Sequence, residues 1–200
     1  DCEYPFKELC GCGVGFKLIQ ALASKKGETV NDLVLYLDLV ATAIGADIVP
    51  IVGENRILAY HGLKVINKNP RPGFEAILKQ VKKEKLTITD VVFIIAPRIN
   101  AAGRMKHGNH AVTLLCETDI NLAAKYAIDI DTYNTDRRDA DKRITIEALT
   151  QIEKNMEQDR FTSVVYNENW HKGVIGIVAS RLIETYYRPT LVFTKSGEML

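Results

Sequence analysis

Two arginines, Arg98 and Arg104, stand six residues apart in the segment IIAPRINAAGRM (residues 94–105). Between them lie Asn100, two alanines and Gly103, all of which are small or able to form hydrogen bonds. A guanidinium group presents a planar fork of donors that suits phosphate oxygens, and small neighbours let a sugar–phosphate backbone lie close. The segment therefore predicts a phosphate contact. The residues leave one alternative open, a structural pair of arginines bonded to the C-terminal carbonyls of a helix.

A second segment, WHKGVIGIVASRL (residues 170–182), brings His171 and a lysine to the start of a predicted helix. Gly173 at this start would let a ligand approach free backbone N–H groups, and helix N-termini attract anions. Small residues, among them Ser180, keep one face of the helix thin, and Arg181 follows directly. The pattern favours an anion site. The alternative is a helix that packs tightly on a sheet through its small residues, with His171 merely exposed.

Asp47 is the third candidate, because it stands between an apolar helix and a short apolar run in IGADIVPI (residues 44–51). A carboxylate in such surroundings needs compensation for its charge. A divalent cation such as Mg²⁺ or Mn²⁺, which prefers oxygen ligands, would supply it. The alternative is an aspartate that only caps the helix or forms a turn.

The cysteines and glycines near the N-terminus are interpreted as structural. The C-x-C pair has no matching second pair and no histidine at ligand spacing, so reduced thiols are expected rather than a zinc site. The glycines of LCGCGVGFKL (residues 9–18) match no phosphate-binding loop, and close approach of another backbone is their expected role. The four cysteines are Cys2, Cys10, Cys12 and Cys116.

Composition gives the broad class of the protein. The 200 residues are 46% hydrophobic and 26% charged, as in an ordinary soluble globular protein. Apolar runs fall short of the roughly 18 to 20 residues that a membrane span needs, and no signal peptide is recognised, so a cytoplasmic location is expected. The net charge is only +1, but residues 91–116 contain bases and no acid. Both ends look cut, and we expect a fragment of a larger protein.

The elements that must position these residues are mostly helical. Apolar periodicity predicts helices at residues 5–23, 29–46 (with Asn31 as a cap), 54–67 and 74–84, and Thr89 is the expected cap of the arginine segment. Residues 121–156 read as one helix near 35 residues long with a polar middle, typical of a rod that joins two bodies. Residues 161–166, 174–187 and 190–193 then read as strand, helix and strand, which opens an α/β unit.

Six segments together carry a resemblance to a known family. LCGCGVGFKL, YLDLVATAIGADIVPI, NRILAYHGL, IIAPRINAAGRM, YNTDRRDAD and WHKGVIGIVASRLIETYYRP occur in the order seen in RecJ-like members of the DHH phosphoesterase superfamily. The resemblance implies an α/β fold with three parts. These are the mostly helical C-terminal part of a DHH catalytic domain (1–112), a long connecting helix (113–157), and the start of a DHH-associated α/β domain that binds nucleic acid (158–200).

The family implies a function as well. RecJ-like enzymes remove nucleotides from the 5′ end of single-stranded DNA in repair and recombination, using two Mn²⁺ or Mg²⁺ ions. Single-strand-binding protein and repair helicases are the expected further partners, and a monomer is expected. By the resemblance Asp47 is a metal ligand, and Arg104 also acts in catalysis. Contact with the nucleic acid is implied for Arg98, Asn100, Arg104, His171, Gly173, Ser180 and Arg181.

The chain also departs from the family pattern. The family's D-x-D run, its middle aspartate and its DHH triplet would lie before Asp1, and its Gly-Gly-His motif would follow Leu200. With one expected metal ligand present, these 200 residues are predicted to be inactive alone. Two other functions stay open: a DHH phosphodiesterase acting on oligoribonucleotides or cyclic dinucleotides, and a RecJ-like scaffold that binds without cleaving.

Overall fold

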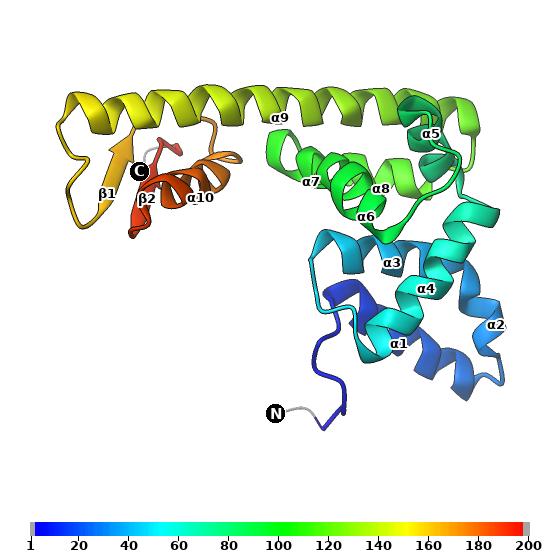
Figure 1. Cartoon of the computed structure of the whole chain (residues 1–200). Helices are drawn as coiled ribbons and strands as arrows, with labels where there is room; N and C mark the ends of the chain where they lie inside the picture. The colour runs from blue at the N-terminus through cyan, green and yellow to red at the C-terminus, as the bar shows by residue number, and fades with distance from the viewer. Residues whose placement is uncertain (1–2, 198–200) are drawn as a thin grey trace.

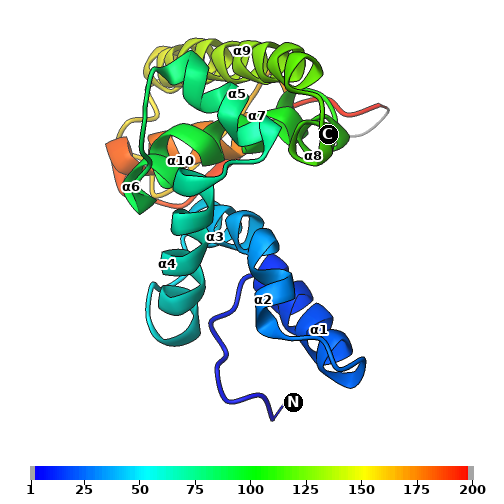
Figure 2. The ribbon, with the colours of Figure 1, turned by 90° about the vertical axis from the view of Figure 1, so that its right-hand side faces the viewer.

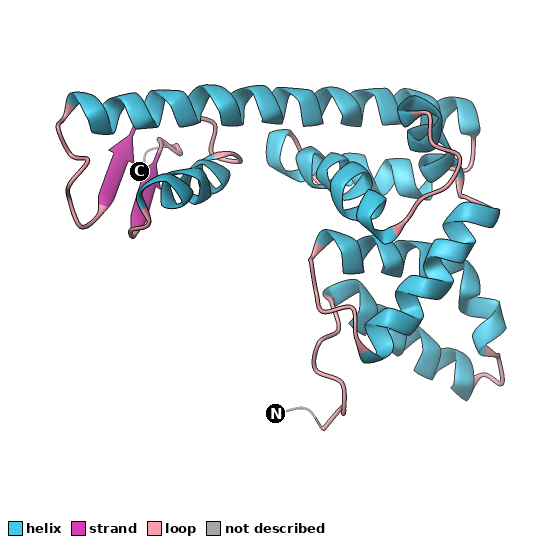
Figure 3. Cartoon of the chain, viewed as in Figure 1, coloured by secondary structure: helices cyan, strands magenta, loops and turns pink. Residues whose placement is uncertain are grey.

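The structure is a computed structural model that describes residues 3–197, so Cys2 lies outside the described residues. Its dominant feature is one long helix, α9, and the other elements lie on one side of it (Figure 1). Figure 3 shows that helices prevail and that the strands are confined to one end of α9. The predicted α/β class, mostly helical with a small parallel sheet, is confirmed.

The first half of the chain builds the helices that lie below and along the start of α9 (Figures 1 and 2). In order they are α1 (Gly11–Lys25), α2 (Val30–Leu33), a 3₁₀ turn (Val34–Tyr36), α3 (Leu37–Ala46), α4 (Gly53–Lys68), α5 (Pro72–Val81), α6 (Ile88–Asp90), a π-helical segment (Val91–Ile95), α7 (Ala96–Met105) and α8 (Asn109–Cys116). The second half holds α9 (Ile120–Lys154), β1 (Ser163–Tyr166), α10 (Ile175–Tyr186) and β2 (Thr190–Phe193).

The long helix was predicted and is confirmed. Asp119 caps it, because its carboxylate accepts hydrogen bonds from the backbone N–H groups of Asn121 (2.7 Å) and Leu122 (3.1 Å). Buried residues then follow at three- and four-residue steps, apart from one seven-residue step between Asn134 and Asp141. The buried residues of α9 are Ala123, Ala127, Ile130, Asn134, Asp141, Ile144, Ala148 and Ile152.

Three hydrophobic clusters hold the structure together, and α9 takes part in two of them. Its N-terminal half, with Ile130, packs into the cluster formed with α5, α7 and α8. Its C-terminal half, with Ile144, packs with β1 and α10 in a separate cluster. The third cluster joins α1, α3 and α4. The two halves of the helix therefore pack into different clusters.

The strand–helix–strand unit forms as predicted. β1 and β2 are parallel and pair from Ser163 with Thr190 to Tyr166 with Phe193, and α10 is the crossover between them. Parallel neighbours need such a crossover connection. β1 is shorter than the predicted strand 161–166, and its side chains alternate between buried and exposed instead of being buried throughout. One face of this two-stranded sheet is thus open within the described residues.

Two predicted helices have different boundaries. The first begins at Gly11 and not near Pro5, because the segment before it is tied to α4: Asn55 donates to the Glu8 carbonyl at 2.6 Å. The second, predicted over residues 29–46, is broken at the 3₁₀ turn. At this turn Arg71 donates to the Leu35 carbonyl at 3.4 Å and to the Asp38 carboxylate at 2.6 Å.

Two predicted caps are also wrong. Thr29, not Asn31, precedes α2, and its N–H and hydroxyl both donate to Asp32 at 2.9 Å. Thr87, not Thr89, precedes α6, where its backbone N–H and hydroxyl donate to Asp90. In both cases the cap is the threonine that has an acid three residues later, the spacing of a capping box.

The structure also describes the N-terminal glycines and the cysteines that the sequence analysis singled out. Added Cβ atoms at Gly11 and Gly15 would meet nothing within 4 Å among the described residues, so the predicted close approach is absent there. Cys10 is a buried free thiol, and Cys12 and Cys116 are exposed free thiols.

Over residues 3–197, no helix is long and apolar enough to cross a membrane.

Candidate nucleic-acid interface

The arginine segment forms α7, whose first turn contains Pro97. The π-helical segment Val91–Ile95 runs directly into this turn, and a proline, which has no N–H, cannot continue a regular ladder of helical hydrogen bonds there. The apolar run before it does not stop the core: Val91 and Ile95 lie in the π-helical segment and are buried. Arg98, Asn100 and Arg104 therefore project from a short helix that is anchored by core residues.

Arg98 is held by neighbouring protein groups. Its guanidinium pairs with the Asp131 carboxylate of α9 at 2.8 Å and donates to the Ile94 carbonyl at 2.9 Å. Its side chain is 18% exposed, and its buried Nε has no hydrogen-bond partner among the described atoms. This geometry matches the structural alternative for Arg98, which fastens α7 to α9. Contact of Arg98 with phosphate stays a prediction.

Arg104 lies where the two predicted anion segments meet. Its Nη1 lies 3.4 Å from the carbonyl oxygen of Gly173, 69 residues later in the chain. A Cβ atom on Gly173 would lie only 2.1 Å from the Arg104 carbonyl oxygen, so no larger residue fits. The next residue, Met105, packs against the cluster beneath α10. The glycine therefore permits close contact between the end of α7 and the start of α10.

The start of α10 differs from the sequence-based expectation. The backbone N–H of Gly173 is not free, because it donates to Nδ1 of His171 at 3.1 Å. The space beside Gly173 is filled by the backbone of Arg104. His171 is partly buried. These residues bring the two segments together, and their direct contact with nucleic acid stays a prediction.

A cavity of about 200 Å³ lies between the two segments and the end of α3. Asn100 and Arg104 of α7 line it, together with Ile177 of α10. Ala46 and Ile48, the residues on either side of Asp47, line the same cavity. All three segments singled out in the sequence therefore border one cavity, although they are far apart along the chain.

Asp47 itself is exposed at the C-terminal end of α3. Ile48, which follows it, is 79% exposed and has a φ of +52°, a left-handed conformation that is unfavourable for a β-branched residue. Such strained positions persist where the surrounding structure enforces them, and they cluster at functional sites. A left-handed residue after the C-cap is a common way for a helix to end, and the unusual feature here is that a β-branched isoleucine takes this position.

The described residues alone do not make a metal site. Over residues 3–197, no group of three or more His, Cys, Asp or Glu side chains is placed to hold an ion. Mg²⁺ and Mn²⁺ take several oxygen ligands, and two ions take more. Asp47 offers one carboxylate, so the donor set present here does not fit the metal pair that the family resemblance implies.

The C-terminal part of the second segment borders a larger cavity of about 780 Å³. Arg181 lines it and reaches the Asp141 carboxylate of α9 at 3.5 Å and that of Glu184 at 3.9 Å. Ser180 is exposed, and its hydroxyl bonds to the Gly176 carbonyl one turn back. Arg181 thus faces the polar middle of α9, while Ser180 makes only a local helical bond in the described structure.

Arg137, in the middle of α9, was missed by the sequence analysis. It lines both cavities, the smaller with Arg104 and the larger with Arg181. A signal existed, because the buried stripe of α9 turns polar at Asn134, Arg137 and Asp141 while keeping its three- and four-residue steps. A polar interruption of an otherwise apolar stripe marks a place where the helix does not face a core.

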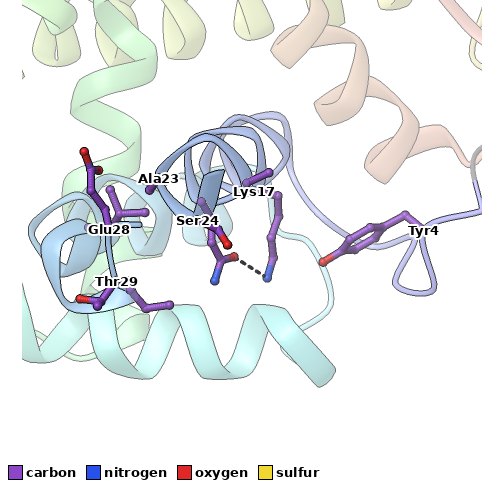
Figure 4. A pocket seen from close by; sticks show the side chains of 10 residues that line it. Tyr4, Lys17, Ala23, Ser24, Glu28 and Thr29 are labelled. Atoms are coloured by element: carbon purple, nitrogen blue, oxygen red, sulfur yellow. Dashed lines mark hydrogen bonds between the residues drawn. The ribbon is translucent and has the colours of Figure 1, made fainter. Parts of the chain in front are cut away.

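A further cavity of about 500 Å³ lies at the other end of the molecule, between α1 and α2 (Figure 4). Lys17 points into it beside Gln20, to which it donates at 3.3 Å, and also pairs with Glu54 at 2.5 Å. Tyr4 lies on its rim and donates to Glu54 at 2.8 Å. None of the predicted site residues lines this cavity.

Comparison with known proteins identifies relatives over almost the whole chain. It is 36% identical over 214 residues to the single-stranded-DNA-specific exonuclease RecJ of Escherichia coli (strain K12), covering 99% of this chain and 37% of the relative. It is 39% identical over 193 residues to the RecJ of Bacillus subtilis (strain 168), covering 96% of this chain and 24% of the relative. The chain thus spans between about a quarter and two fifths of the length of these relatives. No protein-family model matches it.

Solved structures agree in fold. An exonuclease RecJ bound to manganese superimposes with a TM-score of 0.86 at 30% identity, covering 96% of this chain and 48% of the other. RecJ of Thermus thermophilus in complex with Mg²⁺ gives a TM-score of 0.84 at 31% identity, covering 95% of this chain and 30% of the other.

Proposed function

Because the chain is RecJ-like in sequence and fold over almost its whole length, we propose that it is part of a metal-dependent exonuclease that hydrolyses phosphodiester bonds of single-stranded DNA in repair and recombination. The observation that carries the proposal is the shared cavity. The turn around Asp47, the Asn100 and Arg104 side chains, and the start of α10 border one space between two bodies. A single strand passing there would meet all three segments.

The roles proposed for individual residues follow from their positions. Asp47 is the ligand that this chain contributes to a Mn²⁺ or Mg²⁺ site, whose other ligands come from outside these residues. Arg104 is placed to neutralise charge on the phosphate, since Gly103 beside it is exposed and small. Asn100, His171, Gly173, Ser180 and Arg181 belong to the path of the strand, and Arg98 supports α7.

The proposed domain boundaries follow the two packed bodies. Residues 1–112 would belong to the catalytic domain, 113–157 to the connector, and 158–200 to the domain that holds nucleic acid. α8 (Asn109–Cys116) runs across the first of these boundaries, and α9 lies within the connector. Digestion would proceed from the 5′ end in the 5′ to 3′ direction. Binding would depend on backbone charge and stacking more than on sequence.

The setting of the reaction is proposed from the same relatives. Single-stranded DNA is the substrate, and single-strand-binding protein and repair helicases are the further partners. A monomer in the cytoplasm is the expected working form. Support comes from the relatives, which are named as single-stranded-DNA-specific exonucleases.

The direct test uses a 5′-labelled oligonucleotide with Mn²⁺, comparing the full-length protein that carries this chain with the 200 residues alone. We expect the full-length protein to shorten single-stranded DNA and to leave the duplex intact, and the 200-residue chain to cleave neither. Preference for oligoribonucleotides or cyclic dinucleotides would favour a phosphodiesterase. Binding without any cleavage by the full-length protein would favour a scaffold.

A further inference from the structure

The middle of α9 carries several basic side chains, and together with those of α7 and α10 they outnumber the acidic side chains that line the same cavities. Arg137 is half-buried there and lines both the small cavity that contains Arg104 and the large cavity that contains Arg181. The larger cavity is also lined by Arg138 and Lys142. Arg137 therefore lies between two groups of cations drawn from three different helices.

Helical spacing explains how α10 completes this cluster. Ile177 and Arg181 stand four residues apart on α10, and the first lines the small cavity while the second lines the large one. Arg137 and Asp141 have the same spacing on α9. Residues four apart share a helix face, so these two faces oppose each other across the cavities.

The positive charge is incompletely neutralised. Burial lowers the pKa of Arg137, Asp141 raises it, and the nearby Arg138, Arg104 and Arg181 lower it further. Asp141 is also the carboxylate that Arg181 reaches at 3.5 Å, and Glu184 lies 3.9 Å from Arg181. The larger cavity is lined by two acids, Asp139 and Asp141, and by four bases, so positive charge is in excess. Half-buried like charges are unfavourable without a counter-ion, and a bound anion would remove that cost.

Arg137 is also oriented by a buried neighbour. Its Nη2 donates to Oδ1 of Asn134 at 2.8 Å, and Asn134 is buried in the stripe of α9. A guanidinium group has five N–H donors, so this contact fixes the group while leaving most of its fork available. A fixed fork in a cationic cavity suits the paired oxygens of a phosphate.

We propose that Arg104, Arg137 and Arg181 form a binding site for phosphodiester groups of a single strand, with Arg137 as its central contact. The inference rests on the proposed function, because it takes the substrate class from it. It adds a contact on the connector, so that the strand is held by α7, α9 and α10 together. Through these contacts, the relative placement of the two bodies would be coupled to binding of the strand.

The test measures DNA affinity of the full-length protein without divalent cations, so that binding is separated from cleavage. Labelled single-stranded DNA is titrated at several salt concentrations with the wild type and with Arg137→Gln. We expect about a tenfold loss of affinity and a salt dependence weaker by about 0.7 in the slope of log K against log salt, as for one lost phosphate contact. Arg143→Gln is the matched control, since Arg143 is exposed on α9 and lines neither cavity.

A second measurement separates binding from folding. Removing Arg137 relieves repulsion, so Arg137→Gln should melt at the same temperature as the wild type or higher, and added inorganic phosphate should raise the melting temperature of the wild type more than that of the variant. A lower melting temperature together with unchanged DNA affinity would show a structural arginine and overturn the proposal.

The outcomes also distinguish this inference from the proposed function. If the wild type digests single-stranded DNA and Arg137→Gln binds it with unchanged affinity and salt slope, the nuclease assignment stands and the arginine site is wrong. If the wild type neither binds nor digests single-stranded DNA, both are wrong. Equal losses in Arg137→Gln and Arg143→Gln would indicate general charge attraction and would also contradict a defined site.

Discussion

Asp90 is the carboxylate whose protonation is most clearly tied to folding. Lys83 pairs with it, and the Thr87 backbone and hydroxyl donate to it at 2.9 Å and 2.8 Å, so its pKa falls from the usual 3.8 to about 2. A depressed folded-state pKa stabilises the protein above the unfolded value, and the stabilisation is lost as pH falls through the folded value.

We therefore expect Asp90→Asn to remove part of the loss of stability that the wild type shows between about pH 4 and pH 2. At neutral pH the variant should be less stable than the wild type. Thermal unfolding across this range checks both points. Asp159→Asn, at an exposed position, is the control and should follow the wild-type curve. An Asp90→Asn curve parallel to the wild type would contradict the assignment.

Arg98 offers a second test at a single residue, because its contacts are with protein. Arg98→Ala removes a charged pair with Asp131 and a bond to the Ile94 carbonyl, and we expect a loss of about 1–3 kcal/mol in the free energy of unfolding. Urea denaturation measures it. Arg143→Ala, which removes an exposed pair with Glu147, should cost under about 0.5 kcal/mol. Equal stability of the two variants would mean that Arg98 does not fasten α7 to α9.

At the scale of elements, the crossing of α3 and α4 depends on Gly62. A Cβ atom there would lie 2.1 Å from the Leu37 carbonyl oxygen and 2.6 Å from the Ala41 Cβ. Helices that approach this closely cannot separate without losing the packing between them. The glycine is therefore required by the crossing, although nothing in its own segment of sequence indicates it.

Gly62→Ala should consequently lower the free energy of unfolding by about 1–3 kcal/mol, the range for overpacking. Gly15→Ala is the matched control, because Gly15 also lies inside a helix, α1, and a Cβ there would meet nothing within 4 Å among the described residues. The control should be neutral or stabilising by about 0.5–1 kcal/mol, since alanine favours helix more than glycine does. Chemical denaturation of both variants decides, and a Gly62→Ala protein as stable as the control would contradict the packing argument.

Sequence periodicity was sufficient for the elements whose pattern is local. The 35-residue α9, the crossover helix α10 and strand β2 all follow from apolar spacing. The capping threonines were also accessible, since each has an acid three residues later. The break between α2 and α3, in contrast, depends on Arg71, which donates to Asp38 at 2.6 Å and lies near the Leu35 carbonyl. A contact between residues so far apart is not visible in a local pattern.

The same limit applies to the candidate site. The sequence predicted phosphate contact for both Arg98 and Arg104 and favoured Arg104. In the structure their surroundings differ, because Asp131 reaches Arg98 and Gly173 reaches Arg104. The sequence analysis also interpreted α9, with its polar middle, only as a connecting helix. It did not single out Arg137, whose neighbours in the two cavities come from α7 and α10. Which side chains share a cavity is decided by tertiary packing, which these motifs do not specify individually.

For the molecule as a whole, the central feature is that two packed bodies meet below α9, where α7 faces α10 (Figure 1). Gly173 lies against the Arg104 backbone at this contact. Asp47 lies at the end of α3, between Ala46 and Ile48, which line the small cavity that Arg104 also borders. A strand held between the bodies would bring its phosphates near Asp47. The central claim is therefore that Asp47 belongs to the reacting centre of a nuclease.

The most direct measurement compares the full-length wild type with Asp47→Ala on 5′-labelled single-stranded DNA and Mn²⁺. We expect the variant to lose at least about a hundredfold in digestion rate, as for a metal-site residue, while it keeps its melting temperature and its DNA affinity without divalent cations. Unchanged digestion by Asp47→Ala would contradict the claim and remove Asp47 from the reacting centre.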